Sequence, residues 1–243
     1  VHVDYGRAGY TRALDKDCYL KYDKIFAVSD EVREAFLQVY GECADRTEVF
    51  HNILDTERIL CMSGEGKGFT DGFAGIRILT VGRLTTQKAF EVSIDAMKLL
   101  KDSGVRARWY VLGEGDQRRK LEEQIAALGL PEDFILCGAV SNPYPYMRQA
   151  DIYVHASRFE GKSIAIQEAQ VLGKAIVASD CSGNREQVIN GVDGLLCELS
   201  PEAVCSAVRE LLNDEDKRRR FGEAAAKKND GGAAETEKLL RML

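Results

Sequence analysis

The stretch DIYVHASRFEGKSIAIQEAQVLGKAIVAS, residues 151–179, has the pattern of a strand, a helix and a second strand. Its two ends are short apolar runs of the kind that form buried strands. Between them, residues 164–172 contain no Gly or Pro, Ser163 stands at the expected N-cap and Gly173 at the expected C-cap. The stretch therefore predicts two parallel strands joined by a right-handed crossover helix.

The same alternation of strands and helices extends to both sides of this unit. The expected strands cover residues 76–82, 106–113, 134–140, 151–157, 174–179 and 194–199. The expected helices cover residues 89–104, 116–129, 142–150, 164–172, 184–190 and, as a polar group, 201–229. Apolar strands that alternate with helices indicate a parallel sheet covered on both faces. We therefore predict an α/β fold with a Rossmann-like, doubly wound parallel sheet.

A separate pattern precedes this domain. Residues 22–29 and 47–53 are expected strands on either side of a helix at 31–41. We interpret residues 1–58 as the remnant of an N-terminal α/β unit, 59–75 as a glycine-rich linker, and 76–243 as the C-terminal domain. Because the chain opens at Val1, we expect a piece of a longer protein, whose exposed edges around 1–58 favour self-association.

The composition excludes several classes of protein. A net charge of −6 argues against general nucleic-acid binding, which needs a basic surface. The seven cysteines contain no C-x-x-C pair, so free thiols in a reducing cytoplasm are the simplest interpretation. No apolar run approaches the about 18 residues that a membrane-spanning helix needs.

Two glutamates, Glu160 and Glu168, stand with seven residues between them. Glu168 falls inside the expected apolar arc of its helix, opposite Gln167 and Gln170, and must find a hydrogen-bond partner there. The helical rise puts the two carboxylates roughly 10 Å apart, too far to share a proton. The spacing suits two contacts on one extended, hydroxylated ligand, with the free amides of 161–164 facing an anion between them. The alternative is a capping acid plus a core Glu paired with an Arg.

The loops after the strands hold further candidates, because ligands bind outside the carboxyl ends of parallel strands. Arg83 and Lys88 follow the first strand and suit a phosphate, although solvated surface charge is the alternative. Gly113 and Gly115 form a lone G-x-G, too short for a dinucleotide fingerprint. The remaining candidates are interpreted as structural or solvated positions. They are the acidic pair Asp214 and Asp216, the histidines His51 and His155, the tyrosines Tyr144, Tyr146 and Tyr153, and the basic run 217–220, for which contact with anionic lipid is the alternative.

These motifs, in this order, resemble the C-terminal domain of retaining GT-B glycosyltransferases, in particular the large family 4. The resemblance covers about residues 76–229, and its most specific parts are 81–100, 110–130 and 135–179. Residues 1–58 resemble the end of the N-terminal, acceptor-side domain of the same fold.

The resemblance implies a role for each matching residue. Arg83 and Lys88 match the pair that grips the donor diphosphate. Glu160 matches the glutamate that holds hydroxyls of the transferred sugar, and Glu168 matches the one that binds the nucleotide ribose. His2 resembles an N-domain histidine that faces the reacting sugar in some relatives, so Glu160 and His2 are the expected catalytic residues.

The same resemblance assigns main-chain contacts and shows departures. Gly161, Lys162, Ser163 and Ile164 match the turn that cradles sugar and phosphate, and Val140 and Ser141 match the base-binding loop. Lys88 is followed by Ala89 where the family has Gly. Lys162 replaces an aromatic residue, and its charge points either to phosphate or to an anionic acceptor.

The expected function is a metal-independent, retaining glycosyltransferase without a cofactor. The expected location is the cytoplasm, with peripheral contact at the inner face of the membrane as the open alternative. Its donor would be a nucleotide-sugar, with UDP-sugar expected, and its acceptor a polysaccharide or a lipid-linked glycan. This piece alone is expected to bind nucleotide weakly and to transfer nothing. Two alternatives remain: a nucleotide-sugar epimerase of the same fold, and a module that only binds a nucleotide.

Overall fold

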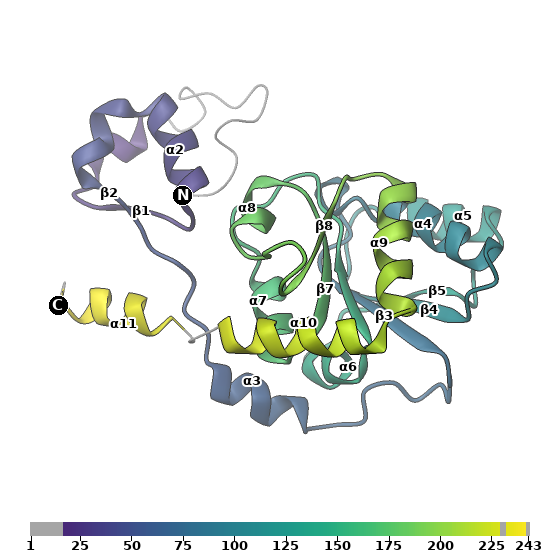
Figure 1. The fold of residues 1–243 in the computed structure, drawn as a ribbon. Helices are drawn as coiled ribbons and strands as arrows, with labels where there is room; N and C mark the ends of the chain where they lie inside the picture. Colours follow the sequence, from purple (N-terminus) through teal and green to yellow (C-terminus); the bar gives the residue numbers. More distant parts are fainter. Residues whose placement is uncertain (1–16, 229–231, 242–243) are drawn as a thin grey trace.

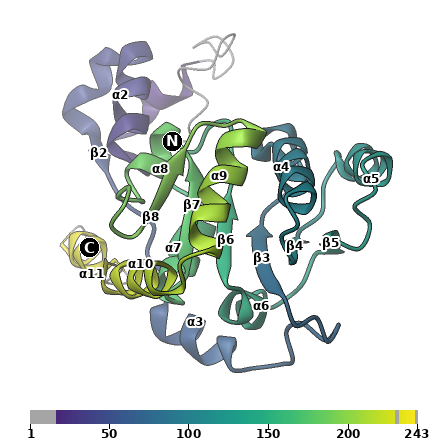
Figure 2. The ribbon, with the colours of Figure 1, turned by 45° about the vertical axis from the view of Figure 1, so that its right-hand side comes forward.

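The computed structural model describes residues 17–228 and 232–241 (Figure 1). Its central feature is a six-stranded sheet in which all neighbouring strands are parallel, in the order β5-β4-β3-β6-β7-β8 (Figure 2). The strands are β3 (Ile76–Val81), β4 (Ala107–Leu112), β5 (Phe134–Gly138), β6 (Ile152–His155), β7 (Ala175–Ser179) and β8 (Gly194–Cys197). The strand order reverses direction between β3 and β6, which confirms the doubly wound α/β fold.

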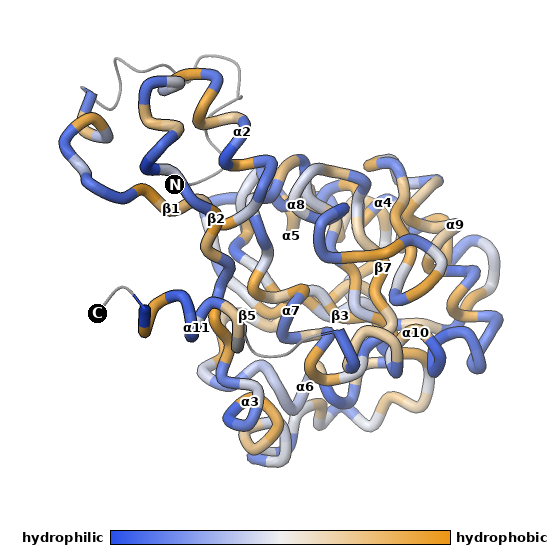
Figure 3. Tube along the Cα trace, turned by 60° about the vertical axis from the view of Figure 1, so that its left-hand side comes forward, coloured by the Kyte–Doolittle hydropathy of each residue, from blue (hydrophilic) through white to orange (hydrophobic). Residues whose placement is uncertain are grey.

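Helices cover both faces of this sheet. On one face lie α4 (Phe90–Asp102), α5 (Arg118–Ala127), α9 (Pro201–Leu212) and α10 (Glu215–Lys228). On the other lie α6 (Tyr144–Gln149), α7 (Ile164–Val171) and the short α8 (Ser182–Arg185). Hydrophobic segments gather among the strands, and the outer loops are largely hydrophilic (Figure 3). No helix in 17–228 or 232–241 is both long enough and apolar enough to cross a membrane.

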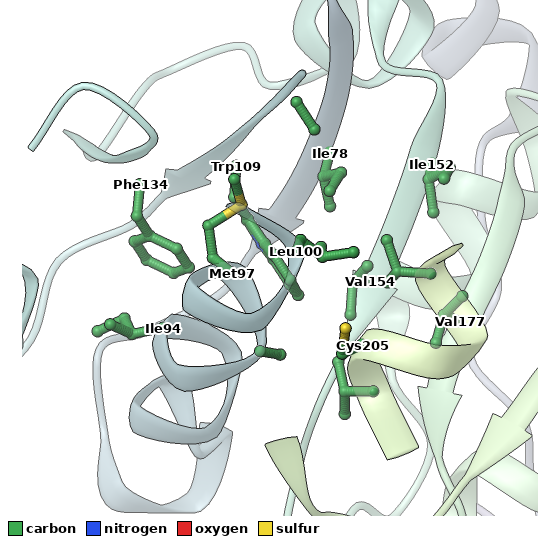
Figure 4. Packing of buried hydrophobic residues seen from close by; sticks show 14 of the residues in the cluster. Ile78, Ile94, Met97, Leu100, Trp109, Phe134, Ile152, Val154, Val177 and Cys205 are labelled. Carbon is green, nitrogen blue, oxygen red and sulfur yellow. The ribbon is translucent and has the colours of Figure 1, made fainter. Parts of the chain in front are cut away.

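Successive residues of a strand point to opposite faces of the sheet and belong to two separate hydrophobic cores. Ile78 belongs to the core under α4 and α9, whereas its neighbour Leu79 belongs to the core under α6 and α7. The first core is built around Trp109, which is fully buried and faces Met97 of α4 (Figure 4). The indole Nε1 of Trp109 donates to Oγ1 of Thr80 over 3.0 Å, so burying the ring leaves no unpaired donor.

The N-terminal segment has a small core of its own. It contains the 3₁₀ helices η1 (Cys18–Lys21) and η2 (Gly41–Arg46), the parallel strands β1 (Ile25–Ala27) and β2 (Thr47–Val49), and α2 (Asp30–Val39). Phe36 and Tyr40 stack with ring centroids 5.1 Å apart at its centre. The described strands and the intervening helix agree with the sequence pattern, and the domain boundaries at 58 and 75 stay a prediction.

Two helices join the N-terminal segment to the sheet domain. α3 (Thr56–Ser63) packs against α6 and α7, although the sequence predicted linker from residue 59. The side chain of Asp55 caps α3 by accepting from the amide of Arg58, which is why the helix begins there. At the other end of the chain, α11 (Ala233–Leu240) returns to the N-terminal segment, where Nζ of Lys238 donates to the carbonyl of Val49 over 3.5 Å.

The helix α7 is confirmed and Ile166 and Ala169 are buried as expected, but the rest of its expected buried face is partly wrong. Gln167 and Gln170 are buried, while Ile164 is 52% exposed. Nε2 of Gln170 donates to the carbonyl of Gln187 over 2.7 Å, and Nδ2 of Asn52 lies 3.5 Å from Oε1 of Gln167. Hydrogen bonds to the loop after α8 and to the N-terminal segment therefore offset the desolvation of these amides.

Candidate active site

The carboxyl ends of β3, β4, β5 and β6 bring four loops to one edge of the sheet, as the parallel topology requires. These loops are residues 82–89, 113–117, 139–143 and 156–163. They contain most of the expected site residues within the described ranges. His2 lies outside the described residues.

Lys88 and Glu160 come from different loops and form a largely buried ion pair. Nζ of Lys88 donates to Oε1 of Glu160 over 2.6 Å, and the two side chains are 18% and 8% exposed. His155 at the end of β6 lies against both, with Nε2 at 3.0 Å from Oε1 of Glu160 and 3.3 Å from Nζ of Lys88. A pair this buried is stable only with additional hydrogen bonds, and His155 supplies one.

The protonation states of this cluster follow from its surroundings. Burial alone would raise the pKa of Glu160, but the hydrogen bonds and charges of His155 and Lys88 outweigh it and lower the pKa to about 2. Burial, helped by the charge of Lys88, lowers the pKa of His155. Nδ1 of His155 is buried with no hydrogen-bond partner in the described part of the chain, which places the single proton on Nε2. Glu160 is therefore an anion that accepts from a neutral imidazole.

Arg83, on the same loop as Lys88, lines a cavity of about 380 Å³. The walls are mostly apolar and come from the ends of β3 and β4 and the loop after β5. They are Val81, Gly82, Leu112, Gly113, Glu114, Ala139, Val140 and Pro143. Arg83 itself is exposed and forms no ion pair with any described residue. An apolar hollow with a free guanidinium at its edge suits a flat ring attached to an anionic group.

Glycines let two of these loops approach closely. A Cβ on Gly113, whose φ is 154°, would lie 1.9 Å from the carbonyl oxygen of Gly82. A Cβ on Gly115 would lie 2.3 Å from the carbonyl oxygen of Leu84. The lone G-x-G therefore serves close packing of the two loops, which brings the start of the Arg83 loop against the end of β4.

The turn between Glu160 and α7 presents unpaired backbone donors. The amides of residues 161–163 have no acceptor among the residues that the structure describes, and they precede the positive end of α7. Gly183 supports the turn from behind, because a Cβ there would lie 2.3 Å from the carbonyl oxygen of Gly161. Oγ of Ser182 also donates to the carbonyl of Glu160 over 3.3 Å. The turn is thus held in place with its donors free for an anion.

Glu168 has a different partner from the one considered as an alternative. Its Oε1 accepts from the hydroxyl of Tyr144 over 2.8 Å, and not from an arginine. Burial raises the pKa of Glu168, and the bond from Tyr144 opposes that rise. Burial and the bond to Glu168 raise the pKa of Tyr144 to about 12, so the phenol keeps its proton.

The family description "Glycosyl transferases group 1" matches residues 75–228, more than half of the chain. The chain belongs to this family. The match covers the whole of the six-stranded sheet and all four loops of the candidate site.

Relatives support the same assignment. The protein is 31% identical over 205 residues to a Campylobacter jejuni enzyme named N-acetylgalactosamine-N,N'-diacetylbacillosaminyl-diphospho-undecaprenol 4-alpha-N-acetylgalactosaminyltransferase, covering 84% of this chain and 54% of that one. It is 33% identical over 148 residues to a GDP-mannose-dependent alpha-(1-6)-phosphatidylinositol dimannoside mannosyltransferase of Mycobacterium tuberculosis, covering 60% and 38%. The chain spans about half the length of the curated relatives it matches.

Solved structures confirm the GT-B fold. Anabaena HepE in complex with UDP and glucose superposes with a TM-score of 0.79 at 21% identity, covering 90% of this chain and 62% of that one. TarM of S. aureus, also solved with UDP, superposes with a TM-score of 0.82 at 16% identity, covering 99% and 49%.

Lys162 and Ser141, both expected at the donor site, line cavities other than the one that Arg83 borders. Lys162 lines a polar cavity of about 130 Å³ at the junction with the N-terminal segment, together with Asn52 and Glu186. Burial lowers the pKa of Lys162, and the charge of Glu186 opposes that change. Ser141 is exposed and borders the linker residues 65–68.

The site contains two residues whose roles the sequence did not predict. His155 was interpreted as a core or lining residue, and Tyr144 as a packing residue. The position of His155 at the end of a strand, five residues before Glu160, was the available signal. The side chains of the basic run 217–220 largely pair within their own region, for example Lys217 with Glu210, which agrees with a solvated helix face. Within the described ranges no group of three His, Cys, Asp or Glu side chains forms a metal site.

Proposed function

We propose that the protein transfers a sugar, with retention at the anomeric carbon, from a UDP-sugar to a polysaccharide or a lipid-linked glycan. The observation that carries the proposal is the meeting of Lys88 and Glu160 at the carboxyl ends of β3 and β6, directly before the free amides of residues 161–163. A cation, an anionic hydrogen-bond acceptor and a helix N-terminus at one point suit a ligand with hydroxyls on one side and a diphosphate on the other.

The diphosphate is the leaving group of this reaction, and its negative charge grows as the bond to the sugar breaks. Arg83 and Lys88 would stabilise that charge from one side, and the amides of residues 161–163 with the dipole of α7 from the other. Fixed donors of this kind are typically worth about 3 kcal/mol each in a transition state. We propose that these groups supply the charge stabilisation without a metal ion.

Glu160 would orient the sugar and would not act as a proton shuttle. Its pKa of about 2 keeps it ionised at neutral pH, so it accepts hydrogen bonds from sugar hydroxyls and has no proton to give. Glu168 would accept from the ribose. Val140 and Pro143 would cover the base from the apolar cavity beside Arg83.

The choice of UDP rests on the two superposable structures solved with UDP. The main alternative nucleotide is GDP, because one relative is named as GDP-mannose-dependent. A lipid-linked acceptor is supported by the relative named for a diphospho-undecaprenol substrate. An epimerase would need acid and base groups that exchange protons with the sugar, and the ionised Glu160 does not favour that role.

Calorimetric titration of the chain with UDP, GDP, ADP and NAD, each with EDTA and then with magnesium, tests the proposal. We expect UDP to bind in EDTA with the highest affinity of the four, and Arg83→Ala to weaken that binding about tenfold. Binding of NAD alone, or binding of any nucleotide only in the presence of magnesium, would overturn the proposed donor site. Tighter binding of GDP than of UDP would change the proposed base from uracil to guanine and would leave the proposed donor site unchanged.

A further inference from the structure

The geometry points to Tyr144 as a positioning residue that fixes the carboxylate of Glu168 and thereby gives the site its preference for ribose over deoxyribose. This inference rests on the proposed function, because it concerns the nucleotide half of the donor.

The contact between the two residues is specific and partly shielded. The hydroxyl of Tyr144, on the first turn of α6, donates to Oε1 of Glu168 on the second turn of α7 over 2.8 Å. Both side chains are half-buried. The other carboxylate oxygen, Oε2, meets no donor within the described ranges, so it stays available to a ligand. One oxygen is therefore anchored by the protein while the second keeps its accepting capacity.

Tyr144 is itself held by the loop that borders the apolar cavity. Its backbone amide donates to Oδ1 of Asn142 over 3.2 Å, and Nδ2 of Asn142 donates to the carbonyl of Met62 over 2.8 Å. Met62 belongs to α3, which packs against both α6 and α7 (Figure 1). These contacts fix the position of Tyr144. Its hydroxyl therefore determines which rotation of the Glu168 carboxylate is favoured.

An oriented Glu168 carboxylate should favour a sugar that carries hydroxyls over one that lacks them. A carboxylate is an acceptor only, so it gains from the 2′ and 3′ hydroxyls of a ribose and gains nothing from the hydrogen atoms of a dideoxyribose. A hydrogen bond between a hydroxyl and a charged acceptor changes affinity about tenfold or more, provided that the acceptor is oriented in advance. Without the phenol, no hydrogen bond from a described residue holds the Glu168 carboxylate, and nothing opposes the rise in its pKa that burial causes.

The experiment compares UDP with 2′,3′-dideoxy-UDP by calorimetry, in EDTA, for the unmodified chain and for Tyr144→Phe. The expected preference of the unmodified chain for UDP is at least tenfold. Tyr144→Phe should lose most of this preference and should bind the dideoxy nucleotide as the unmodified chain does. Glu168→Gln should lose the preference in the same way, because both substitutions act on one carboxylate.

Tyr146→Phe is the matched control. Tyr146 lies two residues further along α6, where its ring packs edge-on against Phe69 with centroids 5.1 Å apart, and its hydroxyl donates to no described residue. This variant should keep the full preference for UDP. Thermal unfolding of all variants identifies any that fail to fold.

Each outcome bears on one claim. A full ribose preference in Tyr144→Phe would overturn the inference, and so would an equal loss of affinity for both nucleotides, which is the mark of a merely structural role. Equal binding of the two nucleotides by the unmodified chain would overturn the ribose role of Glu168 and, with it, this inference. Failure of the unmodified chain to bind either nucleotide would overturn the proposed function itself.

Discussion

The ammonium group of Lys88 and the carboxylate of Glu160 lie 2.6 Å apart, although 72 positions separate them in the chain. The contact joins the loop after β3 to the loop after β6, which are neighbouring strands. The topology of the sheet therefore creates the pair, and His155 completes it from the end of β6.

Replacement of Lys88 by Met should weaken binding of UDP by at least tenfold and lower the free energy of unfolding by about 3 kcal/mol, because it leaves a buried carboxylate with one partner fewer. Calorimetry and urea unfolding measure the two effects. Lys98→Met is the control, since Lys98 pairs with Asp102 on the exposed face of α4 and such pairs contribute about 0.5 kcal/mol. Equal effects of the two substitutions would mean that the Lys88–Glu160 pair has no special role.

Replacement of Gly183 by Ala should displace the turn at residues 161–163, although Gly183 lies outside that turn. The new Cβ would lie 2.3 Å from the carbonyl oxygen of Gly161 and 2.7 Å from that of Glu160, so the turn must move. We expect a loss of about 2 kcal/mol in stability and at least a tenfold loss in affinity for UDP. Gly41→Ala, where a Cβ meets nothing within 4 Å, should change neither quantity. Unchanged UDP affinity in Gly183→Ala would show that the position of the turn is unimportant.

Ala89 adopts a left-handed conformation with φ 44° and ψ 41° at the start of α4. This conformation costs about 1–2 kcal/mol for a residue with a Cβ. A glycine avoids that cost but loses more conformational entropy on folding, which costs up to about 1 kcal/mol. Ala89→Gly should therefore keep or raise the free energy of unfolding by up to about 1 kcal/mol, whereas Ala126→Gly in α5 should lower it by about 1 kcal/mol. Urea unfolding measures both, and equal losses would contradict the strain at Ala89.

The pKa of His155 lies below its usual value of 6.5, because burial and the charge of Lys88 oppose protonation. The unfolded chain binds this proton first as the pH falls. The contribution of His155 to stability is therefore complete above pH 6.5 and is lost as the pH falls from there toward the folded-state pKa. Urea unfolding between pH 7 and pH 5 should show a fall in stability, with a slope of up to about 1.4 kcal/mol per pH unit from this group.

The variant His155→Gln should reduce that slope, since glutamine can still donate to Glu160 but does not titrate. An unchanged slope in His155→Gln would show that His155 is not held neutral.

The sequence predicted the fold well because every strand of the sheet is an apolar run bounded by Gly, Pro or polar residues. It predicted which loops meet, since parallel strands end at the same edge. It could not show that Lys88 and Glu160 bind each other, or that His155 lies against both, because these contacts depend on side-chain directions across neighbouring strands. The periodicity of α7 misassigned Gln167 and Gln170 for a related reason: their partners come from residues 52 and 187, far away in the chain.

A crystal structure of the chain with UDP tests the central claim most directly. The account predicts a diphosphate within about 3 Å of Nζ of Lys88 and of at least one amide of residues 161–163, with the ribose hydroxyls at Glu168. Arg83 should contact the phosphates from the same side as Lys88. UDP bound elsewhere, for example in the polar cavity beside Lys162, with Lys88 and Glu160 still paired only to each other, would contradict it.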